Sequence, residues 1–123
     1  MSGRNETTAS KQLAEMAAVD IVGKRNLVDN PLYPIKWIRE RKVVRASEDG
    51  TSVVIWFLFR VNDKFLTGEE FYPLTTVTVL LKREGKDKKW NLVSADLESE
   101  YQPGKPNREK WEFLPDGTSQ KVG

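Results

Sequence analysis

The chain has no cysteine and no histidine among its 123 residues. The absence of cysteine excludes disulfide bonds, thiolate metal sites and a cysteine nucleophile. The absence of histidine removes the side chain that serves most often as a general base near neutral pH and as a metal ligand. We therefore expect no cofactor and no metal, and any catalysis would depend on lysine or carboxylate groups.

The chain also lacks a strong charge of one sign and a long apolar run. It has 20 Lys and Arg residues against 18 Asp and Glu residues, for a net charge of +2, whereas nucleic-acid-binding proteins usually concentrate positive charge. No stretch approaches the roughly 18 to 20 apolar residues of a membrane helix, and the polar start MSGRNETTASKQ is unlike a signal peptide. We predict a protein that binds no nucleic acid and meets a membrane only through a removed N-terminal anchor.

The polar residues at the start of the chain, 1–7, are predicted to form a disordered tether. This run resembles the tether that follows the acylated cysteine of bacterial lipoproteins. Residues 8–114 are expected to form a single α+β domain, and residues 115–123 a flexible tail. The first part of the domain has a helical pattern, and we expect it to pack on a sheet through a face formed by Leu13, Met16, Ala17, Asp20, Ile21 and Lys24.

After Pro34 the apolar period changes to two, which is typical of strands. We predict four strands, at residues 35–46, 51–61, 71–83 and 89–98. The turn SEDG between the first two supplies the Asp-Gly pair of a tight hairpin. Residues 99–109 are interpreted as a loop, and residues 110–120 as a short fifth strand or an ordered tail. The predicted fold is α+β, with the N-terminal helix packed on a curved four-stranded antiparallel sheet.

The second predicted strand contains the stretch VVIWFLFRV, residues 53–61, which is apolar on both faces. The helix covers one face. The other face needs sheet curvature, the C-terminal segment, a partner chain or a ligand, because exposed contiguous apolar area usually marks an interaction site. A protein partner is expected there, and a homodimer through the sheet is one such arrangement. Large aromatic side chains dominate binding energy at interfaces, so the predicted anchors are Trp37, Trp56, Trp111 and Phe113.

Two hairpins carry a family resemblance. The stretches VVRASEDGTSVVIWFLFRV and TVTVLLKREGKDKKWNLVSADLE resemble the first and the closing hairpin of the nuclear-transport-factor-like branch of the cystatin-like superfamily. With only about 30 residues before the first strand, the layout is closest to the periplasmic domain of VirB-type assembly factors of type IV secretion and to small bacterial envelope lipoproteins. The resemblance implies a scaffold located in the periplasm or cell envelope, with the cytoplasm as the alternative. True cystatins are a poorer match, because the chain lacks their Gln-x-Val-x-Gly hairpin and Pro-Trp loop.

Two other functions stay open at this point. A small apolar ligand would sit in a pocket between helix and sheet, lined by Leu13, Met16, Asp20, Ile21, Trp56, Phe57 and Tyr72. Related isomerases use an acid and a tyrosine for proton transfer, and in this chain Asp20 with Tyr33 or Tyr72 would take those roles. The simpler interpretation of Asp20 is an ion pair with Lys24, four residues further along the helix.

The basic residues of the first strand, Arg39, Arg41 and Arg45, share one parity with Trp37 and Val43. They would hold an acidic protein or lipid surface, or they are solvated charges that discourage edge-to-edge aggregation. Asp96 and Glu98 have no shaped loop around them, so we interpret them as a solvated strand face rather than a cation site. The leading hypothesis is a non-catalytic interaction or assembly module, an accessory subunit of a bacterial cell-envelope or secretion complex.

Overall fold

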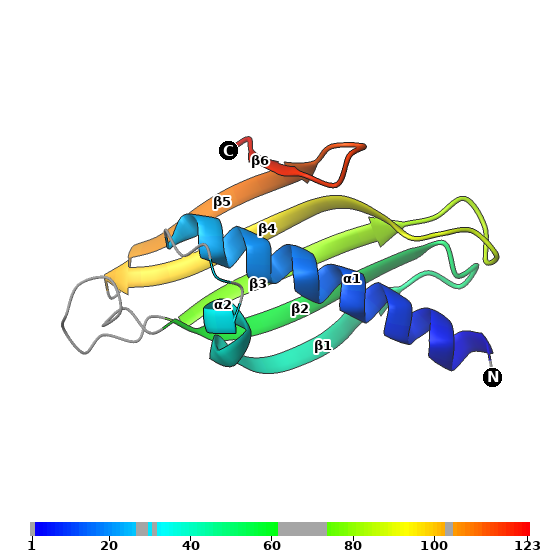
Figure 1. The fold of residues 1–123 in the computed structure, drawn as a ribbon, viewed down its shortest axis with the longest axis horizontal. Coiled ribbons are helices and arrows are strands. Elements are labelled where there is room, and N and C mark those ends of the chain that lie inside the picture. The colour runs from blue at the N-terminus through cyan, green and yellow to red at the C-terminus, as the bar shows by residue number, and fades with distance from the viewer. Residues whose placement is uncertain (1, 27–29, 31, 62–73, 103–104) are drawn as a thin grey trace.

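The computed structural model describes residues 2–26, 30, 32–61, 74–102 and 105–123. Two helices lie on one face of an antiparallel sheet, and the long first helix crosses that face diagonally (Figure 1). No helix in the described part of the chain is both long and apolar enough to cross a membrane. The elements are α1 (Ser2–Arg25), α2 (Leu32–Trp37), β1 (Ile38–Ala46), β2 (Ser52–Arg60), β3 (Leu74–Lys82), β4 (Asn91–Gln102), β5 (Lys105–Phe113) and β6 (Ser119–Lys121).

The sheet contains six strands in the order of the chain, and every neighbouring pair is antiparallel. The prediction of a four-stranded sheet is therefore wrong, although the α+β class agrees with the structure. The error lies in residues 99–109, which two prolines and a glycine made resemble a loop. In the structure β4 continues through Gln102, β5 begins at Lys105, and these two long strands pair with each other.

A tight turn then adds β6 at the edge of the sheet. The N–H of Gly117 donates to the carbonyl of Leu114 at 2.8 Å, and the N–H of Leu114 donates to the carbonyl of Thr118 at 2.8 Å. Gly117 has a φ of 90°, a conformation that glycine adopts without the strain a side chain brings. The sheet therefore extends beyond residue 114, and α1 extends back to Ser2, so neither expected boundary coincides with the end of an element.

The core lies between α1 and the middle strands. Alternate residues of β2 point toward the helix, and the largest of them, Phe57 and Phe59, are at most 1% exposed. The helix contributes Ala14, Ala18 and Val22, all 0% exposed. The remaining members of the core come chiefly from β3 and β4 and from the C-terminal half of α1: Val19, Ile21, Val77, Val79, Leu81, Ala95 and Leu97.

The predicted sheet-facing side of the helix is wrong for three of its six members. Met16 is 71% exposed, and Asp20 and Lys24 are exposed as well, whereas Ala17 and Ile21 are buried. The sheet instead receives a stripe of small residues, because alanine lets the helix backbone approach the strands closely. The prediction placed the large apolar residue Met16 on the face that packs on the sheet, whereas this side chain is exposed to solvent.

Strand β1 forms one edge of the sheet and contains two register shifts, between Ile38 and Glu40 and between Val43 and Arg45. Each extra residue reverses the alternation of faces. The prediction that Arg39, Arg41 and Arg45 share a face is therefore wrong. Charges and bulges on an edge strand both hinder pairing with another sheet, which agrees with the anti-aggregation interpretation of this segment.

Candidate functional site

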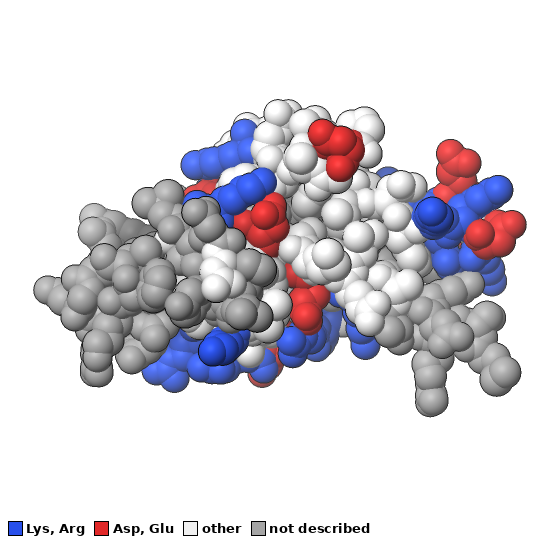
Figure 2. All heavy atoms as spheres, viewed as in Figure 1, with Lys and Arg blue, Asp and Glu red and all other residues white. Residues whose placement is uncertain are grey.

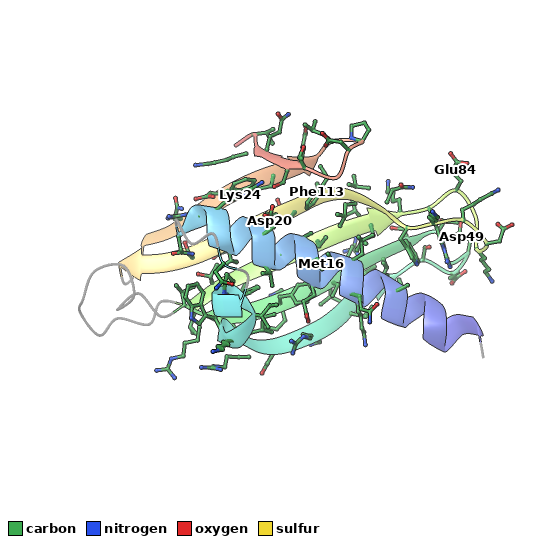
Figure 3. All side chains as sticks on the ribbon, in the orientation of Figure 1. Met16, Asp20, Lys24, Asp49, Glu84 and Phe113 are labelled. Atoms are coloured by element: carbon green, nitrogen blue, oxygen red, sulfur yellow. The ribbon has the colours of Figure 1, made fainter. Side chains whose placement is uncertain are left out.

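A groove with a volume of about 830 Å³ lies over α1, between α2 and the β5–β6 turn. Met16, Asp20 and Lys24 follow one another along the exposed side of α1, and Phe113 comes from β5 beside them (Figure 3). Figure 2 shows that this part of the surface is largely uncharged, with acidic side chains around it. The lining residues are Leu13, Glu15, Met16, Ala17, Val19, Asp20, Gly23, Lys24, Pro34, Ile35, Leu92, Phe113, Asp116, Gly117 and Thr118.

The floor of the groove is apolar and continuous with the core. Leu13, Leu92 and Phe113 are half-buried and pack against the buried cluster under α1. Met16 and Ile35 also line the groove, and they remain 71% and 41% exposed. Met16 is thus an exposed apolar side chain in a groove whose floor is held in place by the core. Apolar surface of this kind is available to bind another molecule, because nothing described in the protein buries it.

One rim of the groove joins α1 to β6. The Lys24 ammonium lies 3.1 Å from the Asp20 carboxylate and also donates a hydrogen bond of 3.1 Å to the hydroxyl of Ser119. That hydroxyl donates to Asp20 at 3.4 Å. The predicted ion pair between Asp20 and Lys24 is thus confirmed. The Asp20 side chain is 54% exposed, so it lacks the desolvated surroundings that a carboxylate general base requires.

The other rim carboxylates are also held by donors. Glu15 pairs with Arg41 of β1. Asp116 accepts hydrogen bonds from the hydroxyl of Thr118 at 2.7 Å and from its N–H at 2.9 Å. These bonds lower the pKa of Asp116 below its usual range, with the hydroxyl contributing most. Asp116 therefore stays ionised near neutral pH, and the charged rim surrounds an apolar floor.

A second cluster of polar side chains fixes the C-terminal end of α1 to β5. The Glu109 carboxylate, whose side chain is 4% exposed, lies 2.5 Å from the guanidinium of Arg25. It also accepts hydrogen bonds from the indole N–H of Trp111 at 3.2 Å and from the amide of Asn107 at 3.0 Å. The Lys121 ammonium is 3.9 Å away. A buried carboxylate with this many partners holds the helix end to the sheet.

The hairpin tips at the opposite end carry charges of both signs. Asp49 and Glu84 both lie at this end (Figure 3), and Figure 2 shows basic and acidic side chains mixed there. The Arg83 guanidinium stacks on Trp90, 4.2 Å from the ring centre, and donates to the carbonyl of Gly50 at 2.6 Å. Of the basic residues at the β3–β4 hairpin, Arg83 thus belongs to the contact between two hairpins, and the basic side chains described there are interrupted by Glu84 and Asp87.

The structure separates the predicted pocket residues. Leu13, Met16 and Asp20 line the groove, whereas Ile21 and Phe57 are buried in the core. Tyr72 lies outside the described residues.

The predicted interaction residues are also separated. Trp37 and Trp111 are 6% and 8% exposed and belong to the core. Trp56 is half-buried on the sheet face that turns away from α1, and Phe113 lines the groove. Of the arginines, Arg41 pairs with Glu15, Arg39 donates to the carbonyl of Lys36 at 3.5 Å, and Arg45 lies opposite Val54.

Sequence reasoning missed Ile35, Leu92 and the β5–β6 turn as parts of the groove. These residues stand at the ends of elements that are far apart in the chain, and no local pattern joins them. The described residues contain no group of three or more potential metal ligands. A scan of protein-family models and searches of curated proteins and of solved structures found no match to the chain.

Proposed function

We propose that this chain is a non-catalytic protein-interaction module that binds an apolar segment of a partner protein in the groove over α1. The observation that carries the proposal is the 71% exposure of Met16 within an apolar groove of about 830 Å³. Methionine suits such a surface because its unbranched, polarizable side chain adapts to different partners.

The distribution of charge around the groove supports a protein partner. Protein interfaces have an apolar centre and a polar rim, and here Glu15, Asp20, Lys24 and Asp116 surround an apolar floor. Small-molecule sites instead bury roughly 70–90% of the ligand surface. A groove that leaves Met16 and Ile35 exposed to solvent is better suited to a protein segment, because the rest of the partner protein can shield these side chains from water.

The setting that we propose is an accessory subunit of a bacterial cell-envelope or secretion assembly, with the periplasm as the compartment. The support for this setting is the resemblance of the two hairpins to the nuclear-transport-factor-like branch, together with the short segment before the first strand, a layout similar to that of the VirB-type assembly domains. The rim interactions support a role without catalysis, since Asp20 forms an ion pair in contact with solvent.

The test is a selection of displayed random peptides on the wild-type domain, followed by affinity measurements on two matched variants. Met16→Lys places a charge in the groove, and Leu74→Lys places the same charge at a residue that is 54% exposed on the opposite side of the sheet. The selected peptides should carry spaced apolar anchors and should lose at least about tenfold in affinity on Met16→Lys. Their affinity for Leu74→Lys should equal that for the wild type.

The proposal fails if no peptide is enriched, or if both lysine variants weaken binding equally.

A second candidate function is the binding of a small apolar ligand. The volume of the groove favours it, since such sites have volumes of roughly 300–1,000 Å³. The probe is a fluorescent apolar molecule. If it binds the wild type tightly, if a fatty acid displaces it, and if Met16→Lys abolishes its binding, the groove binds a small apolar ligand rather than a protein segment.

A further inference from the structure

The face of the sheet that turns away from α1 carries an apolar stripe along two central strands. Val54, Trp56 and Leu58 of β2 lie on this face, and in register they oppose Leu80, Thr78 and Thr76 of β3. All six side chains are half-buried. Both described helices lie on the other face (Figure 1), so among the described elements nothing packs on this stripe. Among the described residues, only neighbouring side chains of the sheet shield it from water.

The strands that flank the stripe differ in charge. On this face β1 carries Glu40, Lys42 and Arg45, in register with Leu58, Trp56 and Val54 of β2. On the far side of the stripe β4 carries Ser94, Asp96 and Glu98, in register with Leu80, Thr78 and Thr76 of β3. The two central charges, Lys42 and Asp96, thus lie in one row across the sheet, on either side of Trp56 and Thr78.

Lys42 and Asp96 form no ion pair with any residue that the structure describes. Glu98, the neighbour of Asp96 along the same face, is already paired with Arg108 at 3.5 Å. The row across Trp56 therefore presents one unpaired cation and one unpaired anion at the borders of an apolar stripe.

We propose that two copies of this chain pack face to face through this surface, related by a two-fold axis that runs parallel to the strands above the boundary of β2 and β3. The operation places β2 of one copy over β3 of the other, and β1 over β4. Val54 then meets Leu80 of the second copy, and Trp56 meets Thr78. Lys42 meets Asp96, and the symmetry makes this ion pair twice.

The same operation brings Glu40 over Glu98 of the second copy. The Arg108 guanidinium that pairs with Glu98 lies on the adjacent strand and offsets this repulsion. Lys110 of β5 lies in register with Asp96 in the same way, but no ion pair joins the two, so Asp96 remains available to Lys42 at the centre of the interface.

The area of the face agrees with a weak dimer. Four strands about 4.8 Å apart, taken over the nine-residue length of β1, β2 and β3 at about 3.3 Å per residue, cover roughly 19 by 30 Å, or about 570 Å² per copy. The total of about 1,100 Å² lies at the lower limit for specific interfaces, where association is weak and transient. The groove over α1 lies on the opposite face, so each copy in the dimer keeps its groove open.

The test is sedimentation equilibrium of the full chain between about 1 µM and about 500 µM, a range that covers weak association. Lys42→Glu and Asp96→Lys should each raise the dissociation constant of the dimer at least about tenfold. The double variant, with both charges exchanged, should return it to within about threefold of the wild type. Lys11→Glu makes the same change of charge on an exposed residue of α1 and should leave the dimer intact.

Other outcomes overturn the proposal. A wild-type chain that stays monomeric throughout the range shows that the stripe is solvated. A dimer that resists both single changes, or a double variant that stays dissociated, shows that the Lys42–Asp96 contact is absent. A dimer that dissociates on Met16→Lys rather than on Trp56→Ala places the interface in the groove. Failure of the peptide selection would leave the dimer untouched, because the two surfaces are separate.

Discussion

Replacing Ala18 with leucine should destabilise the protein strongly, whereas replacing Met16 with alanine should change its stability little. Ala18 is 0% exposed and lies in the stripe of small residues that packs on the sheet. Three additional carbon atoms have no space there, and overpacking of this kind reduces stability by about 1–3 kcal/mol. Met16 is 71% exposed, and alanine has a slightly higher helix propensity, so the change should stay within about 0.5 kcal/mol.

The assay is urea unfolding followed by tryptophan fluorescence. Trp37 and Trp111 are buried and report the loss of the core. A single domain of this size is expected to unfold in two states, with an m-value of about 1.5 kcal/mol/M. A loss of about 2 kcal/mol in Ala18→Leu therefore lowers the urea midpoint by about 1.3 M. The midpoint of Met16→Ala should move by less than about 0.3 M.

The opposite result would refute the orientation of α1. If the side of the helix that contains Met16 packed on the sheet, Met16→Ala would remove a buried side chain and destabilise the protein by about 2–5 kcal/mol. Ala18→Leu would then be close to neutral. Ala14→Leu provides an independent check, because Ala14 is also 0% exposed and lies one helical turn before Ala18.

Glu109→Gln should reduce the free energy of unfolding by about 2–3 kcal/mol, because it leaves the partly buried Arg25 guanidinium without its carboxylate. Glu98→Gln is the matched control, since the exposed ion pair of Glu98 with Arg108 should contribute less than about 1 kcal/mol. If urea unfolding shows that both variants lose the same free energy of unfolding, the role of burial is contradicted. The hydroxyls of Thr51 and Ser47 and the Thr51 N–H donate to Asp49 and lower its pKa from 3.8 to about 2. Its contribution to stability is thus complete above about pH 4 and lost as the pH falls toward 2; NMR titration should show Thr51→Val moving this pKa toward 3.8, and a wild-type value already near 3.8 would contradict the bonding.

The middle of the sheet was predictable because each signal there is local. The β-branched and aromatic residues of the short apolar run 53–61 indicate a strand, and Asp49-Gly50 indicates the turn that precedes it. Both features appear in the structure, with Gly50 at a φ of 73°. Period and turn chemistry act over a few residues, so the sequence displays them directly.

The features that were missed depend on contacts between distant residues. The stretch around Pro103, Gly104 and Pro106 has the composition of a loop, and only pairing with the preceding strand makes β5. The carboxylate of Glu109 is stabilised in the interior by Arg25, 84 positions earlier by residue number. Composition does not reveal such a partner.

The helix face and the arginines were mispredicted for related reasons. The hydrophobic pattern assigned Met16 to the core. In the structure the helix packs closely on the sheet, and the residues buried at this contact include the small residues Ala14 and Ala18. Strict alternation placed Arg41 and Arg45 on one face, and the bulge between Val43 and Arg45 put them on opposite faces. Groove residues such as Leu92 and Ile35 become neighbours only when the whole chain is folded.

The strand order of the sheet also sets the sequence of events during synthesis. Each strand pairs only with strands adjacent to it in the chain, so the sheet can grow one strand at a time as the chain leaves the ribosome. Helix α1 is made first, yet its alanine stripe has no surface to pack on until β2, β3 and β4 have emerged. The domain therefore gains its core late, when the middle of the sheet is complete, and until then its N-terminal helix depends on the local stability of its own turns.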